Sequence, residues 1–281
     1  MSTSATALYA GLGAGLVASL ITRAIERFGG RRGGVLGTLP TTIVPASLGV
    51  WSAQASAFDE AMWAVPAGMS LNALFLWLWR ALPPSLPSAW PLIAQLTVMS
   101  LISLSLWAAG ALSWVRLIRP QVEPLSAALS ATLLIVLLGL GATLKPRPSP
   151  RGRAEVSWGT LCMRGLCAGL AVAAAVLLAE RSSGVVSGVA AVFPAIFWTS
   201  MVSVWLSQGS AVSSGAVGPM MLGSSSVALY ALVSVPLFKA LGAPLGALCA
   251  WLIAVACASY PADLWLRRSS LSERLSREEG R

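Results

Sequence analysis

The stretch that decides the fold class is Pro124-Leu-Ser-Ala-Ala-Leu-Ser-Ala-Thr-Leu-Leu-Ile-Val-Leu-Leu-Gly-Leu-Gly-Ala-Thr-Leu144, which contains no charged residue. An α-helix needs about 20 predominantly apolar residues to cross the hydrocarbon core of a bilayer. The stretch meets this requirement, and the charged residues Glu123 and Lys145 flank it. It therefore predicts a transmembrane helix.

The composition extends this interpretation to the whole chain. Hydrophobic residues make up 56% of its 281 residues, charged residues make up 10%, and the mean hydropathy is +0.77. A soluble domain carries about a quarter charged residues, so this chain lacks the charge for a water-facing surface. We expect an all-α, polytopic integral membrane protein that has the lipid bilayer as its main partner. The net charge is +9, and the basic residues that produce it lie between apolar runs, which indicates membrane topology and not nucleic-acid binding.

Nine stretches are long and apolar enough to be membrane spans. The predicted spans are 5–27, 33–54, 61–79, 90–114, 124–144, 158–179, 184–207, 213–237 and 242–266. With this count, most Lys and Arg residues fall on one side of the membrane. Because basic loops stay in the cytoplasm, the N-terminus is predicted outside and the C-terminus inside, in a plasma or inner membrane.

Two parts of the chain resemble each other. Gly11-Leu-Gly-Ala-Gly-Leu16 matches Gly165-Leu-Cys-Ala-Gly-Leu170, and Pro40 matches Pro194. Both matches have the same spacing of 154 positions (194 − 40, for example), and it needs no gap. Glu26-Arg27, Trp51 and Gln54 match Glu180-Arg181, Trp205 and Gln208 at this spacing. Spans one to four are therefore predicted to recur as spans six to nine, with span five as a linker helix.

The two copies are predicted to have opposite orientations in the membrane, because an odd number of spans separates each helix from its copy. Inverted-topology repeats are a recurring feature of secondary transporters. This arrangement resembles the fused double-domain fluoride channels in architecture only. The residues do not follow that family's Asn and Phe motifs, so the resemblance implies no site residue. The expected divisions are a first repeat (1–114), a linker helix with a cytoplasmic loop (115–153), a second repeat (154–268) and a cytoplasmic tail (269–281).

Pro194 lies near the centre of the seventh predicted span, and Pro40 and Pro45 bracket the centre of the second. A proline inside a helix removes one backbone hydrogen bond and leaves a carbonyl free. In a membrane such a break is tolerated only where it is buried in protein or lines a wet cavity. Pro40 and Pro194 therefore predict a substrate site at the midplane. The alternative interpretation is a pair of kinked packing helices.

Uncharged polar residues of neighbouring spans are expected at the same depth as the prolines. Alternatively, each of them makes an ordinary hydrogen bond between helices, worth about 0.6–2 kcal/mol. The predicted lining, besides the two prolines, consists of Thr41, Thr42, Asn72, Ser224 and Ser225.

The centres of the predicted spans hold no Asp, Glu, Lys or Arg, and the chain contains no His. This argues against proton coupling. An enzyme needs a nucleophile with a base, a metal cluster or paired acids, so we expect no catalytic residue, metal or cofactor. The favoured function is a carrier or facilitator for a small neutral, zwitterionic or ionic solute. The alternatives are an ion channel of fused inverted-repeat architecture and a non-transporting scaffold subunit, and a homo-oligomer is compatible with each.

Overall fold

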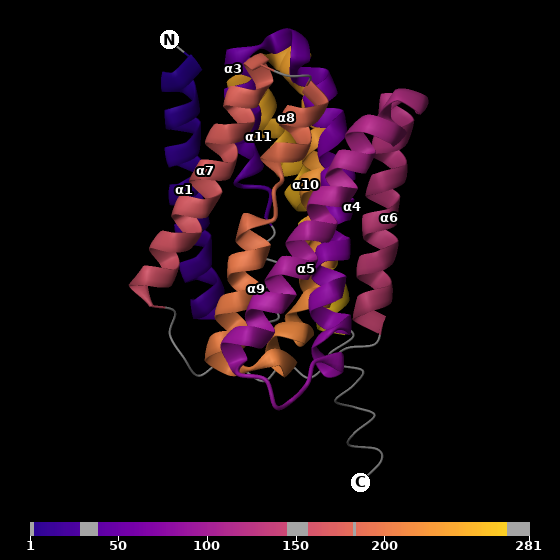
Figure 1. Ribbon diagram of the computed structural model, residues 1–281. Coiled ribbons are helices and arrows are strands. Elements are labelled where there is room, and N and C mark those ends of the chain that lie inside the picture. The colour runs from indigo at the N-terminus through magenta and orange to yellow at the C-terminus, as the bar shows by residue number, and fades with distance from the viewer. Residues whose placement is uncertain (1–2, 29–38, 145–156, 182–183, 269–281) are drawn as a thin grey trace.

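The computed structural model describes residues 3–28, 39–144, 157–181 and 184–268, and every regular element within them is a helix. The helices form one elongated bundle (Figure 1). They are α1 (Thr3–Phe28), α3 (Ile43–Ala53), α4 (Phe58–Ala81), α5 (Leu92–Ser113), α6 (Pro124–Leu144), α7 (Trp158–Arg181), α8 (Gly184–Ala191), α9 (Ala195–Gln208), α10 (Ser210–Leu241) and α11 (Ala243–Ala254). Short 3₁₀ turns lie at Ala55–Ala57, Pro83–Ser85 and Arg119–Gln121, and π-turns extend α5 at Trp114–Ile118 and α11 at Val255–Ser259.

Six helical segments of the described chain are long and apolar enough to cross a membrane, which supports a polytopic protein embedded in a bilayer. They correspond to the third, fourth, fifth, seventh, eighth and ninth predicted spans. The six segments are Ala55–Ala81, Leu92–Gln121, Pro124–Leu144, Gly184–Leu206, Ser210–Leu241 and Ala243–Arg268.

The other three predicted spans also contain helix, but their apolar stretches are shorter. The first and sixth spans form α1 and α7, whose described apolar parts are Ala5–Leu16 and Leu161–Ala174. The second span contributes Ile43–Ala53, while its predicted beginning, 33–38, lies outside the described residues.

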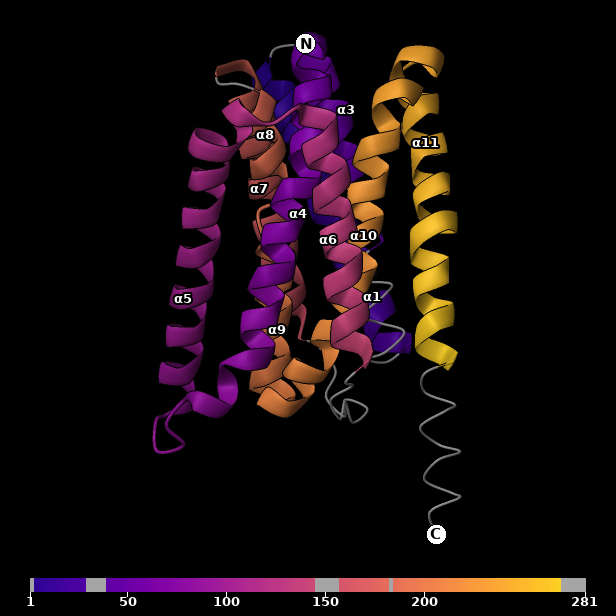
Figure 2. The same cartoon turned by 90° about the vertical axis from the view of Figure 1, so that its right-hand side faces the viewer.

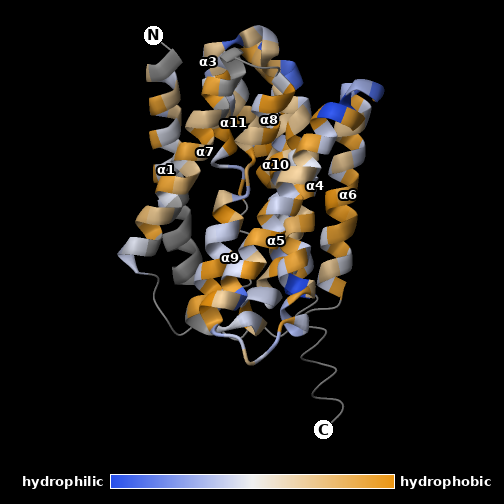
Figure 3. Ribbon diagram, in the orientation of Figure 1, coloured by the Kyte–Doolittle hydropathy of each residue, from blue (hydrophilic) through white to orange (hydrophobic). Residues whose placement is uncertain are grey.

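The helices α4 and α10 lie at the centre of the bundle. In each of them 72% of the most apolar window is buried, against 22% in α5 and 28% in α6. The helix α6 packs against both α4 and α10, and the outer faces of the peripheral helices are largely hydrophobic (Figure 3). Exposed leucines on α5, α6 and α11 fit a lipid-facing surface.

Glycines bring α1 and α7 into backbone contact. A Cβ atom added at Gly11 would lie 2.8 Å from the Gly169 carbonyl oxygen, and one at Gly15 would lie 2.7 Å from that of Gly165. Since the lower number on α1 pairs with the higher number on α7, the two helices run antiparallel. Small residues let helix backbones approach closely, and only glycine fits at this contact.

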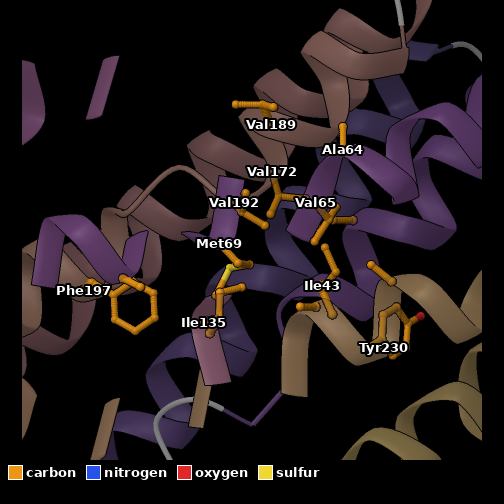
Figure 4. Packing of buried hydrophobic residues seen from close by; sticks show 14 of the residues in the cluster. Ile43, Ala64, Val65, Met69, Ile135, Val172, Val189, Val192, Phe197 and Tyr230 are labelled. Carbon is orange, nitrogen blue, oxygen red and sulfur yellow. The ribbon is translucent and has the colours of Figure 1, made fainter. Parts of the chain in front are cut away.

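A second glycine contact joins α8 to α4. Cβ atoms added at Gly184 and Gly188 would collide with the backbone carbonyls of Ala57 and Ala61. Gly33 and Gly37, which have the same four-residue spacing in the sequence, lie outside the described residues. The buried core continues from this contact through Val65 and Met69 of α4 to α10 (Figure 4).

Charged side chains of α4, α10 and the 3₁₀ turn Arg119–Gln121 meet at one end of the bundle. Asp59 pairs with Lys239, and Glu60 lies 3.7 Å from Arg119. At the other end, the Arg80 guanidinium donates to the Ala142 carbonyl at 2.9 Å. The start of α1 and the end of the last helix lie at opposite ends of the bundle (Figure 2).

Candidate functional site

A three-residue turn separates α8 from α9. The helix α8 ends at Ala191 and α9 begins at Ala195, so the break spans Val192–Pro194. The Ala195 N–H donates to the Phe193 carbonyl at 2.7 Å, which closes a tight turn around Pro194. The proline lacks an N–H and cannot continue the α8 hydrogen-bond ladder.

The same turn occurs before α3. The Thr41 N–H donates to the Leu39 carbonyl at 2.7 Å, around Pro40, and α3 begins at Ile43. The Thr41 hydroxyl also donates to this carbonyl, at 3.3 Å. The two turns therefore share their bonding pattern, with a proline at the centre of each.

Both turns lead into a helix whose first turn has no side-chain cap. The N-cap residue is Thr42 in α3 and Pro194 in α9, and neither makes a side-chain capping hydrogen bond. The first N–H groups of a helix have no partner within the helix. The breaks thus present hydrogen-bond donors and the positive ends of two helix dipoles.

Asn72 lies beside the second break. Its side chain is only 2% exposed, and its Nδ2 donates to the Val192 carbonyl at 2.8 Å. This bond satisfies a carbonyl at the break and fixes the orientation of the amide, which leaves Oδ1 without a hydrogen-bond partner among the described residues. A buried polar atom without a partner costs about 1–3 kcal/mol, so this oxygen marks a place for a ligand or a water.

A cavity of about 60 Å³ lies between the two breaks. Residues from both turns, from the starts of α3 and α9, and from α4, α7 and α10 surround it, and none of the described lining residues is charged. The described lining consists of Leu39, Thr42, Ile43, Met69, Asn72, Ala168, Ala171, Val172, Ala191, Val192, Phe193, Ala195, Ile196, Phe197 and Val227. Figure 4 shows Ile43 of α3, Met69 of α4, Val172 of α7, Val192 of the second break and Phe197 of α9 in one region of the core.

The structure brings some of the predicted site residues together and separates others. Thr42 and Asn72 line the cavity. Pro40 and Pro194 are buried in the turns that form two of its walls, next to lining residues on the chain. Thr41 is part of the first turn but is not among the lining residues.

The two predicted serines lie elsewhere. The hydroxyls of Ser224 and Ser225 donate to the carbonyls of Met221 and Leu222, both at 2.7 Å, within α10. They are buried, but the α10 residue that lines the cavity is Val227. A hydroxyl can donate to a carbonyl of its own helix, whereas the Asn72 amide donates to the Val192 carbonyl of the break.

Sequence reasoning missed the apolar part of the lining. Phe193 and Ile196 flank Pro194, and Leu39 precedes Pro40, so proximity to the prolines was the signal that could have found them. Met69 lies one helical turn before Asn72 on α4. Residues three positions apart lie on the same face of a helix, so the position of Asn72 would have indicated Met69 as well.

The fold and the site define an α-helical membrane protein with an uncharged, partly polar cavity between two helix breaks. Searches with protein-family models, among curated proteins and among solved structures find no match to the chain. The functional argument therefore rests on the residues themselves.

Proposed function

We propose that this protein is a membrane transport protein, a carrier or facilitator that moves a small solute through the cavity between the two breaks. The observation that carries the proposal is that both proline turns border one cavity. Discontinuous helices that meet in this way form the substrate sites of many secondary transporters. An isolated pair of packing kinks would not require a shared, partly polar cavity.

We further propose that the protein has nine spans arranged as two inverted four-helix repeats around the linker α6. The equivalent turn bonds at Thr41 and Ala195 support this arrangement, because they are 154 positions apart (195 − 41). The glycine contacts also support it. Gly11 meets Gly169 and Gly15 meets Gly165, and this reciprocal pairing is what a two-fold axis between α1 and α7 would produce.

The cavity lining follows the same symmetry. Three pairs of lining residues have the repeat spacing of 154 positions, and one pair on α4 and α10 differs from it by one. An odd number of spans is also consistent with chain ends at opposite faces of the bundle (Figure 1). The four pairs are Leu39 with Phe193, Thr42 with Ile196, Ile43 with Phe197, and Asn72 with Val227.

Inverted symmetry gives a physical route to transport. A path around an in-plane two-fold axis has an inward-facing form and an outward-facing form that are related by exchange of the repeats. Movement of one repeat against the other would then open the cavity to either side in turn. The absence of charge in the described lining favours a neutral solute, a zwitterion, or an ion held by dipoles.

We place the end of the bundle that carries Asp59 and Glu60 outside and the end that carries Arg80 in the cytoplasm. Two basic residues at the proposed outer end, Lys239 and Arg119, are each paired with an acid. Paired charges contribute little net positive charge. This pairing agrees with the positive-inside rule.

The test is flux in proteoliposomes that contain the Pro40→Ala/Pro194→Ala double variant. Alanine restores the N–H that a continuous helix needs, so the variant should stay folded but lose flux by at least tenfold. The matched control is Pro66→Ala/Pro219→Ala, because these two prolines lie inside the continuous helices α4 and α10.

Four outcomes separate the candidate functions. If Pro40→Ala/Pro194→Ala loses saturable flux and counterflow while Pro66→Ala/Pro219→Ala keeps them, the result supports a carrier or facilitator. Unitary currents in a single-channel recording would assign a channel instead. Wild-type flux in the Pro40→Ala/Pro194→Ala protein would refute the proposed site, and the absence of any flux in the wild type would favour a scaffold.

A further inference from the structure

An apolar groove of about 660 Å³ lies next to the cavity. It runs between α5 on one side and α7, α8 and α9 on the other, and its walls include Trp107, Leu112, Leu170 and Trp198. None of its described lining residues is charged. In a chain that spans a bilayer, a groove of this composition is accessible to hydrocarbon chains, not to water.

The groove and the cavity share a wall. Ala171, Phe193 and Ala195 line both of them. Phe193 belongs to the break itself, where it directly precedes Pro194. The Phe193 side chain is 39% exposed, and its ring contacts the Trp107 ring of α5 edge to face, with 5.3 Å between centroids. Since small alanines form the rest of the shared wall, the Phe193 ring is the bulky group between the two spaces.

The two spaces differ in what they can bind. The cavity offers the unpartnered, buried Oδ1 of Asn72 as an acceptor. It also borders the uncapped first turns of α3 and α9, whose N–H groups are the donors, apart from Ala195, which is bonded to Phe193, and Pro45, which has no N–H. A ligand that satisfies all of them must carry both an acceptor and a donor. Its polar part must also be small, because about 60 Å³ corresponds to roughly two waters at ~30 Å³ each.

A protonated carboxyl group meets these requirements. Its carbonyl oxygen accepts hydrogen bonds from backbone N–H groups at a helix start, and its O–H donates to an amide oxygen. The group is neutral, so it needs no counter-charge in an uncharged site. Phospholipid head groups carry fixed charge and are much larger than the cavity.

We propose that the site takes a single-chain fatty acid directly from the bilayer, with its carboxyl group in the cavity, its hydrocarbon chain in the groove and Phe193 as the gate between them. This inference rests on the proposed transport function and specifies its substrate class. The lipid-facing groove supplies the entry route, and the polar cavity selects the head group.

The experiment uses palmitic acid that carries a photoreactive diazirine near the end of its chain. The probe is added to the full-length protein in phosphatidylcholine vesicles, and cross-linked peptides are identified by mass spectrometry. We expect labels on the α5 and α8 residues of the groove. Unlabelled palmitic acid should compete two- to tenfold better than methyl palmitate, which has the same chain but no O–H donor.

Two variants test the two halves of the site. Asn72→Leu removes the acceptor and should weaken palmitic acid binding two- to tenfold, so that palmitic acid and methyl palmitate compete equally. Ala171→Leu fills the shared wall without touching a hydrogen bond and should abolish the preference for the acid. The control is Leu129→Phe on the lipid-facing side of α6, which should leave labelling unchanged.

The outcomes distinguish this inference from the transport function. If groove labelling is absent, or if methyl palmitate competes as well as palmitic acid in the wild type, the groove is only a lipid-solvated surface and the inference is overturned. If the proline variant still blocks flux of a water-soluble solute in that case, the transport function stands. If palmitic acid binds as expected but neither it nor any solute crosses the membrane, binding survives and transport is refuted.

Discussion

The replacement Asn72→Leu tests the site most directly, because its effect on stability and its effect on binding are expected to differ. In the wild type, Nδ2 of the buried amide donates to the Val192 carbonyl and, more weakly, to Met69 Sδ at 3.5 Å, while Oδ1 has no partner among the described residues. Leucine has a similar volume and removes both groups. The change therefore has one unfavourable and one favourable consequence for folding.

The two consequences are of similar size. Leaving the Val192 carbonyl without its donor costs about 1–3 kcal/mol, and removing the unpartnered Oδ1 returns about 1–3 kcal/mol. Burial of an apolar side chain adds a small gain. The expected change in the free energy of unfolding is therefore within about 1 kcal/mol of zero, although a buried polar residue is lost.

Binding should respond differently. A ligand that binds only the folded protein stabilises it by about 2.7 kcal/mol when present at 100 times its Kd. If the ligand uses Oδ1, this increment should shrink by about 0.5–1.5 kcal/mol in Asn72→Leu at the same ligand concentration. Thermal unfolding in detergent, with and without a panel of small solutes and fatty acids, measures both quantities.

Two results would refute this reasoning. A destabilisation of more than about 3 kcal/mol without ligand would mean that Oδ1 is paired inside the protein and is not available to a ligand. An unchanged ligand-induced stabilisation in the variant would place the ligand away from Asn72.

Three further predictions follow from other parts of the structure. Gly11→Ala should destabilise the protein by about 1–3 kcal/mol, because its Cβ would lie 2.8 Å from a backbone oxygen of α7. The control Gly13→Ala should be neutral or stabilising, because its Cβ would lie 3.5 Å from a side-chain carbon, and thermal unfolding compares the two variants. Backbone N–H groups that donate to the Glu123 carboxylate hold the pKa of this residue below its usual 4.5. The stabilising effect of Glu123 should therefore be present at neutral pH and disappear on acidification below about pH 4.5. The difference in stability between wild type and Glu123→Gln, followed as a function of pH, measures this effect. In a variant without the native cysteines, a membrane-impermeant thiol reagent applied outside should label Gln121→Cys but not Ser85→Cys, and the reverse result would invert the proposed orientation.

The position of the breaks could be predicted only in part. Pro40 and Pro194 were identified from their repeat spacing, and the chain turns at both. Pro66 and Pro219 also lie deep inside helices, yet α4 and α10 continue through them. At Pro194 a donor from another helix, the Asn72 amide, satisfies a carbonyl of the break. Sequence spacing along one helix does not reveal such a donor.

The lining of the cavity shows a second limit of sequence reasoning. Depth in the membrane can be inferred from position along a span, and depth alone placed Ser224 and Ser225 beside the prolines. The direction in which a side chain points depends on the rotation of its helix, at about 100° per residue. On α10 this rotation directs Val227 to the cavity, while both serines bond back to their own helix.

The proposed symmetry also explains why the site needs only one amide. At a spacing of 155 positions (227 − 72), one longer than the repeat spacing, the counterpart of Asn72 on α10 is Val227, and both residues line the cavity. The backbone scaffold would then be duplicated, while the polar contact would belong to one repeat alone. A ligand bonded to Asn72 would stay with α4 when the repeats move against each other, and it would be released only when the opening side exposes the amide to water. The inward-facing and outward-facing forms would therefore hold the ligand with different affinities, because a ligand can shift an equilibrium only through its differential affinity for the two states. Replacing Val227 with Asn would restore the symmetry of the contact and should make the two affinities converge.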